Sequence, residues 1–217
     1  MLTGPRSALI DAGVGDPGHL DAIERALAGG PLDLVLVTHG HVDHASGVAE
    51  LSRRWPRAIV RGGPGMPLRD GEAFEAGSTR LRAVQTPGHA PDHFCFLDES
   101  TRDLFSGDLV RIGGTVVIPA SRGGDLRQYL ESLERVRGLR PGRLLPGHGP
   151  VIEDPPAIID EYLEHRRLRE RQVIAALEAG CRTPAEIVAR VYPGLPPSLI
   201  AAAEDTVLAH LQKLRHH

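Results

Sequence analysis

The sequence predicts an α/β layered fold followed by a small helical module. In residues 1–154, short apolar segments alternate with amphipathic ones, and strands that alternate with helices favour layers of helix packed on sheet. Several of the predicted strands run directly into a glycine-flanked motif that contains histidine or aspartate. After Asp154-Pro155-Pro156 the pattern becomes purely helical. We therefore expect one domain at residues 1–154 and a second at residues 155–217.

The elements of the first domain follow from hydrophobic periodicity. The LDLVLV segment ending at Val37 is nearly continuous and apolar, which is typical of a strand buried on both faces. Helices are expected where apolar residues recur every three or four positions. The predicted strands are 9–10, 32–37, 58–60, 81–85, 94–97, 104–105 and 143–146, and the predicted helices are about 19–27, 46–55 and 126–136.

The second domain is predicted to be all helical, with helices at about 157–179, after Thr183-Pro184, and at about 198–214. Thr183, Pro184 and Glu186 form an N-cap, a first-turn proline and a capping box. Three helices in this segment indicate a small helix-turn-helix-like module. Its charges balance, so charge does not indicate nucleic-acid binding. Covering one side of a functional groove in the first domain is the alternative role.

Composition excludes several classes of protein. A content of 41% hydrophobic and 24% charged residues argues against disorder. The net charge of −3 argues against a strongly basic protein that coats nucleic acid. No segment approaches the roughly 18 apolar residues of a membrane span, and the start lacks the pattern of a secretory signal. The two cysteines, Cys95 and Cys181, lie far apart. We expect a cytoplasmic protein without a membrane partner.

The strongest chemical signal is the run from His39 to His44, in which His, His, Asp and His follow a predicted buried strand and precede a helix. Imidazole nitrogens and carboxylate oxygens are ligands for zinc. Three later strand ends add further donors, in the motifs Thr86-Pro87-Gly88-His89, Ser106-Gly107-Asp108 and Leu145-Pro146-Gly147-His148-Gly149. Together, five histidines and two aspartates suffice for two three-residue sites that share one bridging carboxylate.

These motifs resemble the metallo-β-lactamase-fold hydrolase superfamily, a four-layer αββα sandwich with a dinuclear metal site at one edge. The resemblance implies that the catalytic residue is Asp43, which orients a metal-bridging hydroxide and helps to protonate the leaving group. Asp at 108, where β-lactamases carry Cys, favours the broad hydrolase branch, and His at 41 disfavours the di-iron redox branch. The implied ligands are His39, His41 and His89 for the first metal, Asp43, His44 and His148 for the second, and Asp108 as the bridge.

A narrower resemblance, to the β-lactamase-like protein 2 family, is carried by the runs TPGHAPDHFCFLDES, LLPGHGPVI and TPAEIVARVYPGLP. Members append a winged-helix-like C-terminal domain, and a characterised branch cleaves single-stranded RNA. Related sequences in polyketide pathways hydrolyse acyl-carrier thioesters. In that family, further strands precede the TGPRSALIDAG segment and a wing hairpin follows the last helix. We therefore expect the sandwich to lack its first N-terminal strands and the small domain to lack its wing.

Two further residues are candidates for a supporting role. Asp11 ends the first predicted strand and either holds a ligand histidine or caps a turn. His93 follows Asp92 and lies four residues after His89. It either supports the metal site or faces the substrate, or it only stabilises its own loop.

The sequence thus predicts a dinuclear zinc hydrolase, with manganese or iron as the other candidate metals. Single-stranded RNA is the first expected substrate. The alternative is a thioester or lactone, such as an acyl-carrier, hydroxyacylglutathione-like or β-lactam compound. An alternative of another class is a non-enzymatic winged-helix regulator that binds nucleic acid. A homodimer is left open.

Overall fold

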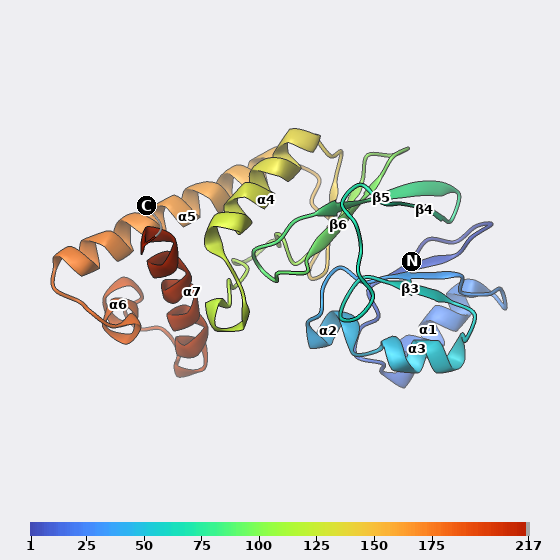
Figure 1. Cartoon of the computed structure of the whole chain (residues 1–217), viewed down its shortest axis with the longest axis horizontal. Coiled ribbons are helices and arrows are strands. Elements are labelled where there is room, and N and C mark those ends of the chain that lie inside the picture. The colour runs from blue at the N-terminus through green and yellow to red at the C-terminus, as the bar shows by residue number, and fades with distance from the viewer. Residues whose placement is uncertain (216–217) are drawn as a thin grey trace.

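Two sheets pack face to face in the computed structural model, which describes residues 1–215 (Figure 1). The first sheet is parallel, with its strands in the order β1, β2, β3. The second is antiparallel from β4 to β7 and parallel between β7 and β8. The strand bounds are β1 Ala8–Ile10, β2 Leu34–Leu36, β3 Ile59–Arg61, β4 Ala73–Ala76, β5 Thr79–Gln85, β6 Phe94–Asp98, β7 Leu104–Gly107 and β8 Leu144–Pro146.

Helices cover the outer face of each sheet, and two more lie at the end of the molecule away from the first sheet (Figure 1). The helices of the first sheet are α1 Pro17–Leu27, α2 Val42–Ala45 and α3 Val48–Arg54. Those against the second sheet are α4 Leu126–Leu139 and α5 Pro155–Glu178, and the remaining elements are η1 Ala120–Arg122, α6 Pro184–Val191 and α7 Pro197–Arg215.

Alternation along β2 separates the first two apolar layers. Leu34 and Leu36 pack against the second sheet, where Leu81 and Phe96 meet them. Val35 points to the opposite face and packs against α1 and α3, because successive side chains of a strand lie on opposite faces. The continuous apolar run is therefore explained by burial on both faces. With α4 and α5 on the outer face of the second sheet, the four layers are helix, sheet, sheet, helix, which confirms the predicted fold.

Helix α5 takes part in two cores. Its first half places Ile159 and Leu163 in the core under the second sheet, and its second half places Val173 and Ala176 in the core of the C-terminal helices. Asp154 caps the helix by accepting a hydrogen bond from the Ala157 backbone at 3.1 Å. The domain boundary between residues 154 and 155 stays a prediction. It falls just before a helix that both parts share.

Some elements differ from the sequence-based expectation. The strand β4 was not predicted, since its sequence AFEA is rich in good helix formers, and its pairing with β5 makes it a strand. A short helix, α2, forms inside the histidine motif. Residues 155–215 contain helices and turns but no strand. Across residues 1–215, none of the helices is both long and apolar enough to traverse a lipid bilayer.

The sheet–sheet core is tested by Phe96→Ala. Phe96 is fully buried between the sheets, so the cavity left by truncation should lower the free energy of unfolding by about 3–5 kcal/mol. Ile59→Ala on β3 is the control, because Ile59 is 50% exposed and its loss should cost within about 0.5 kcal/mol. Urea denaturation measures both. A loss below about 1 kcal/mol for Phe96→Ala would contradict this packing.

Candidate metal centre

The predicted donors converge at one edge of the sandwich because strand direction brings them there. Strands β5 and β7 both run antiparallel to β6, and β8 runs parallel to β7. Their carboxyl ends therefore meet at the same edge, where His89, Asp108 and His148 follow them. The histidine motif leaves β2 towards this edge. Its Thr38 carbonyl accepts a 2.8 Å hydrogen bond from the backbone of Phe94 at the start of β6.

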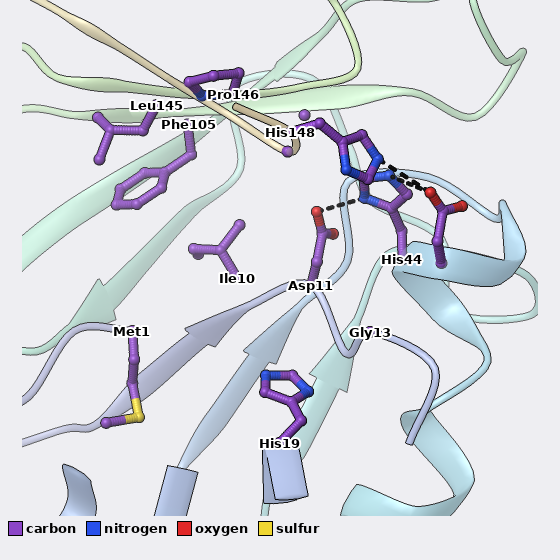
Figure 2. Close-up of a pocket in the computed structure, with 13 residues that line it drawn as sticks. Met1, Ile10, Asp11, Gly13, His19, His44, Phe105, Leu145, Pro146 and His148 are labelled. Atoms are coloured by element: carbon purple, nitrogen blue, oxygen red, sulfur yellow. Dashed lines mark hydrogen bonds and ion pairs between the residues drawn. The ribbon is translucent and has the colours of Figure 1, made fainter. Parts of the chain in front are cut away.

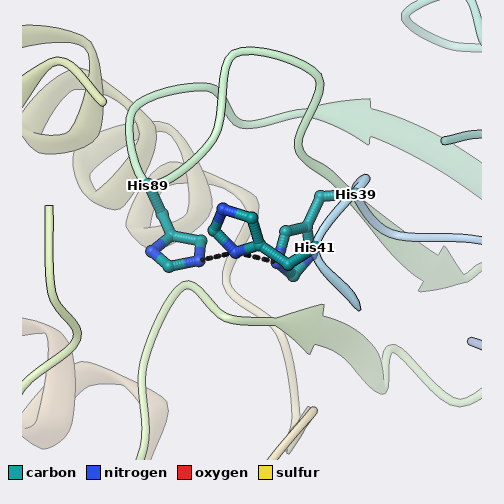
Figure 3. A group of neighbouring side chains, drawn as sticks. All are labelled: His39, His41 and His89. Atoms are coloured by element: carbon teal, nitrogen blue, oxygen red, sulfur yellow. Dashed lines mark hydrogen bonds between the residues drawn. The ribbon is translucent and has the colours of Figure 1, made fainter. Parts of the chain in front are cut away.

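The first triad is formed by His39, His41 and His89 (Figure 3). Nδ1 of His41 lies 3.0 Å from Nε2 of His39 and 3.0 Å from Nε2 of His89. Nδ1 of His89 donates to the Val117 carbonyl at 2.8 Å, so the Nε2 of a neutral His89 carries a lone pair. Burial lowers the pKa of both His39 and His89. Both rings are therefore held neutral, the form that binds metals.

The second triad is formed by Asp43, His44 and His148. Oδ2 of Asp43 lies 3.0 Å from Nε2 of His148 and 3.6 Å from Nε2 of His44. The His44 ring is 2% exposed. Its Nδ1 is 2.7 Å from Oδ2 of Asp11, and a dashed line marks this contact in Figure 2. Its Nε2 has no hydrogen-bond partner among the described residues.

Asp108 lies between the triads and presents one carboxylate oxygen to each. Its Oδ1 lies 3.4 Å from Nε2 of His44 and 3.6 Å from that of His148, while its Oδ2 lies 3.6 Å from Nε2 of His89. Burial opposes ionisation, but the protonated His44 lowers the pKa of Asp108 to about 2. Asp108 is therefore an anion placed between two groups of donors, as a bridging ligand must be.

Asp11 holds both the motif backbone and one ring. It adopts a positive φ of 62°, and its Oδ1 accepts the backbone N–H of Thr38 at 2.7 Å. Its Oδ2 lies 2.7 Å from His44 Nδ1 and accepts the Thr38 hydroxyl at 3.1 Å. A carboxylate on the far nitrogen fixes the orientation of an imidazole ligand. Of the two roles considered for Asp11, the geometry favours support of a ligand histidine.

His93 supports the backbone of Asp108, the predicted bridging aspartate. It is fully buried, and its Nε2 accepts the Asp108 backbone N–H at 3.1 Å. Its Nδ1 therefore carries the proton and donates to the Thr86 hydroxyl at 2.8 Å. Burial lowers the pKa of His93 to about 3, so the ring stays neutral. Gly107 (φ 48°) lets this contact form, because a Cβ there would lie 2.7 Å from His93 Nε2.

The donor set fits divalent cations. The Thr38 hydroxyl donates to Asp11, so it accepts from Nδ1 of His39 and leaves a lone pair on Nε2 of His39. Nδ1 of His41 has at most one proton to offer, but the lone pairs of His39 and His89 both face it.

The carboxylates of Asp108 and Asp11 outweigh burial and raise the pKa of His44 to about 10. Without a metal, the buried Nε2 of His44 therefore carries a proton towards two carboxylates, and a cation could replace that proton. A cation in each triad would satisfy these atoms, and buried charges and lone pairs otherwise carry a large penalty. The structure thus brings all seven predicted donors together, and their role as ligands stays a prediction.

Two groups that position the donors were not predicted from the sequence. Thr38 contacts His39 Nδ1 at 3.0 Å through its hydroxyl, and it could have been noticed as the residue that opens the motif. The Val117 carbonyl that accepts from His89 has no signal in the sequence, because any residue supplies a backbone carbonyl.

Comparisons with known proteins agree with this fold. The family model described as the metallo-beta-lactamase superfamily matches residues 3–65 and 56–148. The model of the beta-lactamase associated winged helix domain matches residues 183–216. Among solved structures, a metallo-beta-lactamase family protein from Thermus thermophilus superposes with a TM-score of 0.77 at 26% identity, covering 99% of this chain and 87% of its own.

Curated relatives extend the similarity over most of the chain. "Lactamase-like protein adaB" of Aspergillus niger is 36% identical, over 98% of this chain and 72% of its own length. "Atrochrysone carboxyl ACP thioesterase" of Aspergillus chevalieri is 37% identical, over 89% of this chain and 67% of its own. The narrower β-lactamase-like protein 2 assignment is not confirmed by these matches. The chain belongs to the metallo-β-lactamase superfamily, carries a C-terminal winged helix domain and is a hydrolase.

Proposed function

We propose that this hydrolase cleaves acyl thioesters with the help of two divalent metal ions. The observation that carries the proposal is the pair of donor triads that share Asp108, beside a cavity with an apolar wall. His39, His41 and His89 would hold one ion, and Asp43, His44 and His148 the other. Five imidazoles in a set of seven donors favour zinc, with manganese or iron as alternatives.

Divalent ions at these positions would polarise a carbonyl and lower the pKa of water enough to provide a nucleophile at neutral pH. In thioester hydrolysis, the water oxygen bonds to the carbonyl carbon, the C–S bond breaks, and a proton from water ends on the leaving thiolate. Asp43 would carry that proton. Its side chain is 52% exposed, and its Oδ2 is 3.0 Å from His148. A thiol has a pKa of about 8.5, so the leaving group needs little acid assistance.

The cavity beside the second triad suits an apolar acyl group. It has a volume of about 360 Å³, and its metal-site wall includes Asp43, His44 and His148. Ile10, Phe105 and Leu145 form an apolar wall (Figure 2). None of the described residues that line it is Arg or Lys, whereas grooves for single-stranded nucleic acid are positively charged.

The name of the thioesterase from Aspergillus chevalieri supports the same substrate class. RNA cleavage, the first expectation from the sequence, is not confirmed and stays a prediction. The purely regulatory alternative is set aside, because the chain belongs to a hydrolase superfamily. A homodimer stays a prediction.

A direct assay separates the two substrates. The purified protein is incubated with an aromatic acyl thioester of N-acetylcysteamine and with labelled single-stranded RNA, each with and without a chelator. We expect thioester hydrolysis that the chelator abolishes and that added Zn²⁺ or Mn²⁺ restores. Turnover that resists chelation would contradict the metal mechanism, and metal-dependent cleavage of RNA alone would contradict the substrate class.

Asp11→Asn tests the support of His44. The amide loses the negative charge beside Nδ1, so we expect metal affinity or turnover to fall about 10–100-fold. Asp21→Asn is the matched control, since Asp21 only pairs with Arg54 on the surface. Metal titration and thioester kinetics of both variants make the comparison. Equal behaviour of the two variants would remove Asp11 from the site.

Leu145→Asn tests the apolar wall. An amide in the wall leaves a polar group facing the acyl chain, so kcat/KM for an aromatic acyl thioester should fall about tenfold. The value for the acetyl thioester should change little. Val151→Asn is the control, because Val151 is exposed beyond the cavity lining. A parallel loss for both substrates would show that the cavity does not hold the acyl group.

A further inference from the structure

The segment from Leu109 to Pro119 joins the bridging aspartate to η1 and contacts a ligand of the first triad. It follows Asp108 directly and contains no helix or strand. The Val117 carbonyl accepts the Nδ1 proton of His89 at 2.8 Å, and this hydrogen bond turns Nε2 of His89 towards His41. The orientation of His89 therefore depends on how firmly this segment is held.

Arg166 of α5 holds the residue next to that carbonyl. Its side chain is 2% exposed, and one of its terminal nitrogens donates to the Val116 carbonyl. Its guanidinium carbon lies 5.3 Å from the centre of the Tyr129 ring, within the range of a cation–π contact. The Val116 carbonyl therefore faces α5, while the Val117 carbonyl faces His89.

The environment of Arg166 is unusual for a buried cation. Within residues 1–215 it forms no ion pair with a carboxylate, and its Nε has no hydrogen-bond partner. Burial of a charge without a counter-charge is costly. An apolar side chain would fill this position beside Tyr129 of α4 at lower cost. The presence of an arginine therefore indicates that its hydrogen bond to the Val116 carbonyl is required.

Two tyrosines hold the earlier part of the segment. The Tyr129 hydroxyl of α4 donates to the Leu109 carbonyl at 2.6 Å. The Tyr162 hydroxyl of α5 accepts the Arg111 backbone N–H at 3.0 Å and lies 3.0 Å from the Gly114 carbonyl. The segment is thus held at its start, middle and end by α4 and α5.

We propose that Arg166 is a positioning residue for the first metal site, acting through the Val116–Val117 peptide on His89. The proposal rests on the proposed function, because it takes His89 as a metal ligand. It gives α5, which continues into the C-terminal helices, a role in the chemistry of the centre. Arg166 itself touches neither substrate nor metal.

Zinc affinity of each triad is the first test. The His148→Ala variant leaves only the first triad complete, and the His41→Ala variant leaves only the second complete. Zinc binding by each variant therefore reports on one triad. We expect Arg166→Met to weaken Zn²⁺ binding about 10–100-fold in the first background and by less than about twofold in the second. Arg166→Gln is measured in parallel, so that the test can still be made if Arg166→Met does not fold. Equal losses in both backgrounds, or none, would overturn the proposal.

The second test needs no metal. The exchange rate of the His89 Nδ1 proton is followed by ¹H–¹⁵N NMR in the metal-free protein. It should rise several-fold in Arg166→Met and not in Arg169→Met, whose guanidinium bonds Gln172 and lies over Tyr192. An unchanged rate in Arg166→Met would overturn the positioning role. If zinc binds neither the His148→Ala nor the His41→Ala variant but exchange is faster in Arg166→Met, the proposed function is refuted. The conclusion that Arg166 positions His89 would still be supported.

Discussion

Three imidazole nitrogens meet in the first triad with at most one proton among them. Nε2 of His39 and Nε2 of His89 both face Nδ1 of His41 at 3.0 Å, and two lone pairs directed at one N–H cannot both be satisfied. In the second triad, the buried Nε2 of His44 faces carboxylates, and a metal ion there would replace the proton on this nitrogen. A cation in the first triad removes the conflict. Holding these donors together lowers the stability of the metal-free fold. The other contacts of the centre keep the donors in this arrangement.

Three of the seven donors are each held by a group from another part of the chain. Asp11 after β1 fixes His44, and the Val117 carbonyl fixes His89. His93 fixes the backbone of Asp108. The rings of His44, His89 and His93 are themselves buried, so they cannot turn away without leaving polar groups unpaired. The pre-organised donors need little rearrangement to bind metal, which is the condition for electrostatic catalysis at a fixed site.

Periodicity and the position of the motifs could predict the layers and the seven donors. The valines and leucines of β2 specify a strand with two buried faces, and glycine-flanked His or Asp residues mark strand ends. The same information could not predict β4, because AFEA forms a strand only through its partner β5. Nor could it predict Val117 or Arg166. A backbone carbonyl carries no residue signature, and an arginine among other arginines of α5 looks like part of a solvated helix face until packing shows that it is buried.

Anomalous diffraction at the zinc edge, from crystals of the protein saturated with Zn²⁺, tests the central claim most directly. We predict two peaks about 3.5–4 Å apart. One should lie about 2.0–2.1 Å from the facing nitrogens of His39, His41 and His89. The other should lie at similar distances from the donors of Asp43, His44 and His148, with Asp108 between the two. A single peak elsewhere on the surface, or no peak at this edge of the sheets, would contradict a two-metal centre.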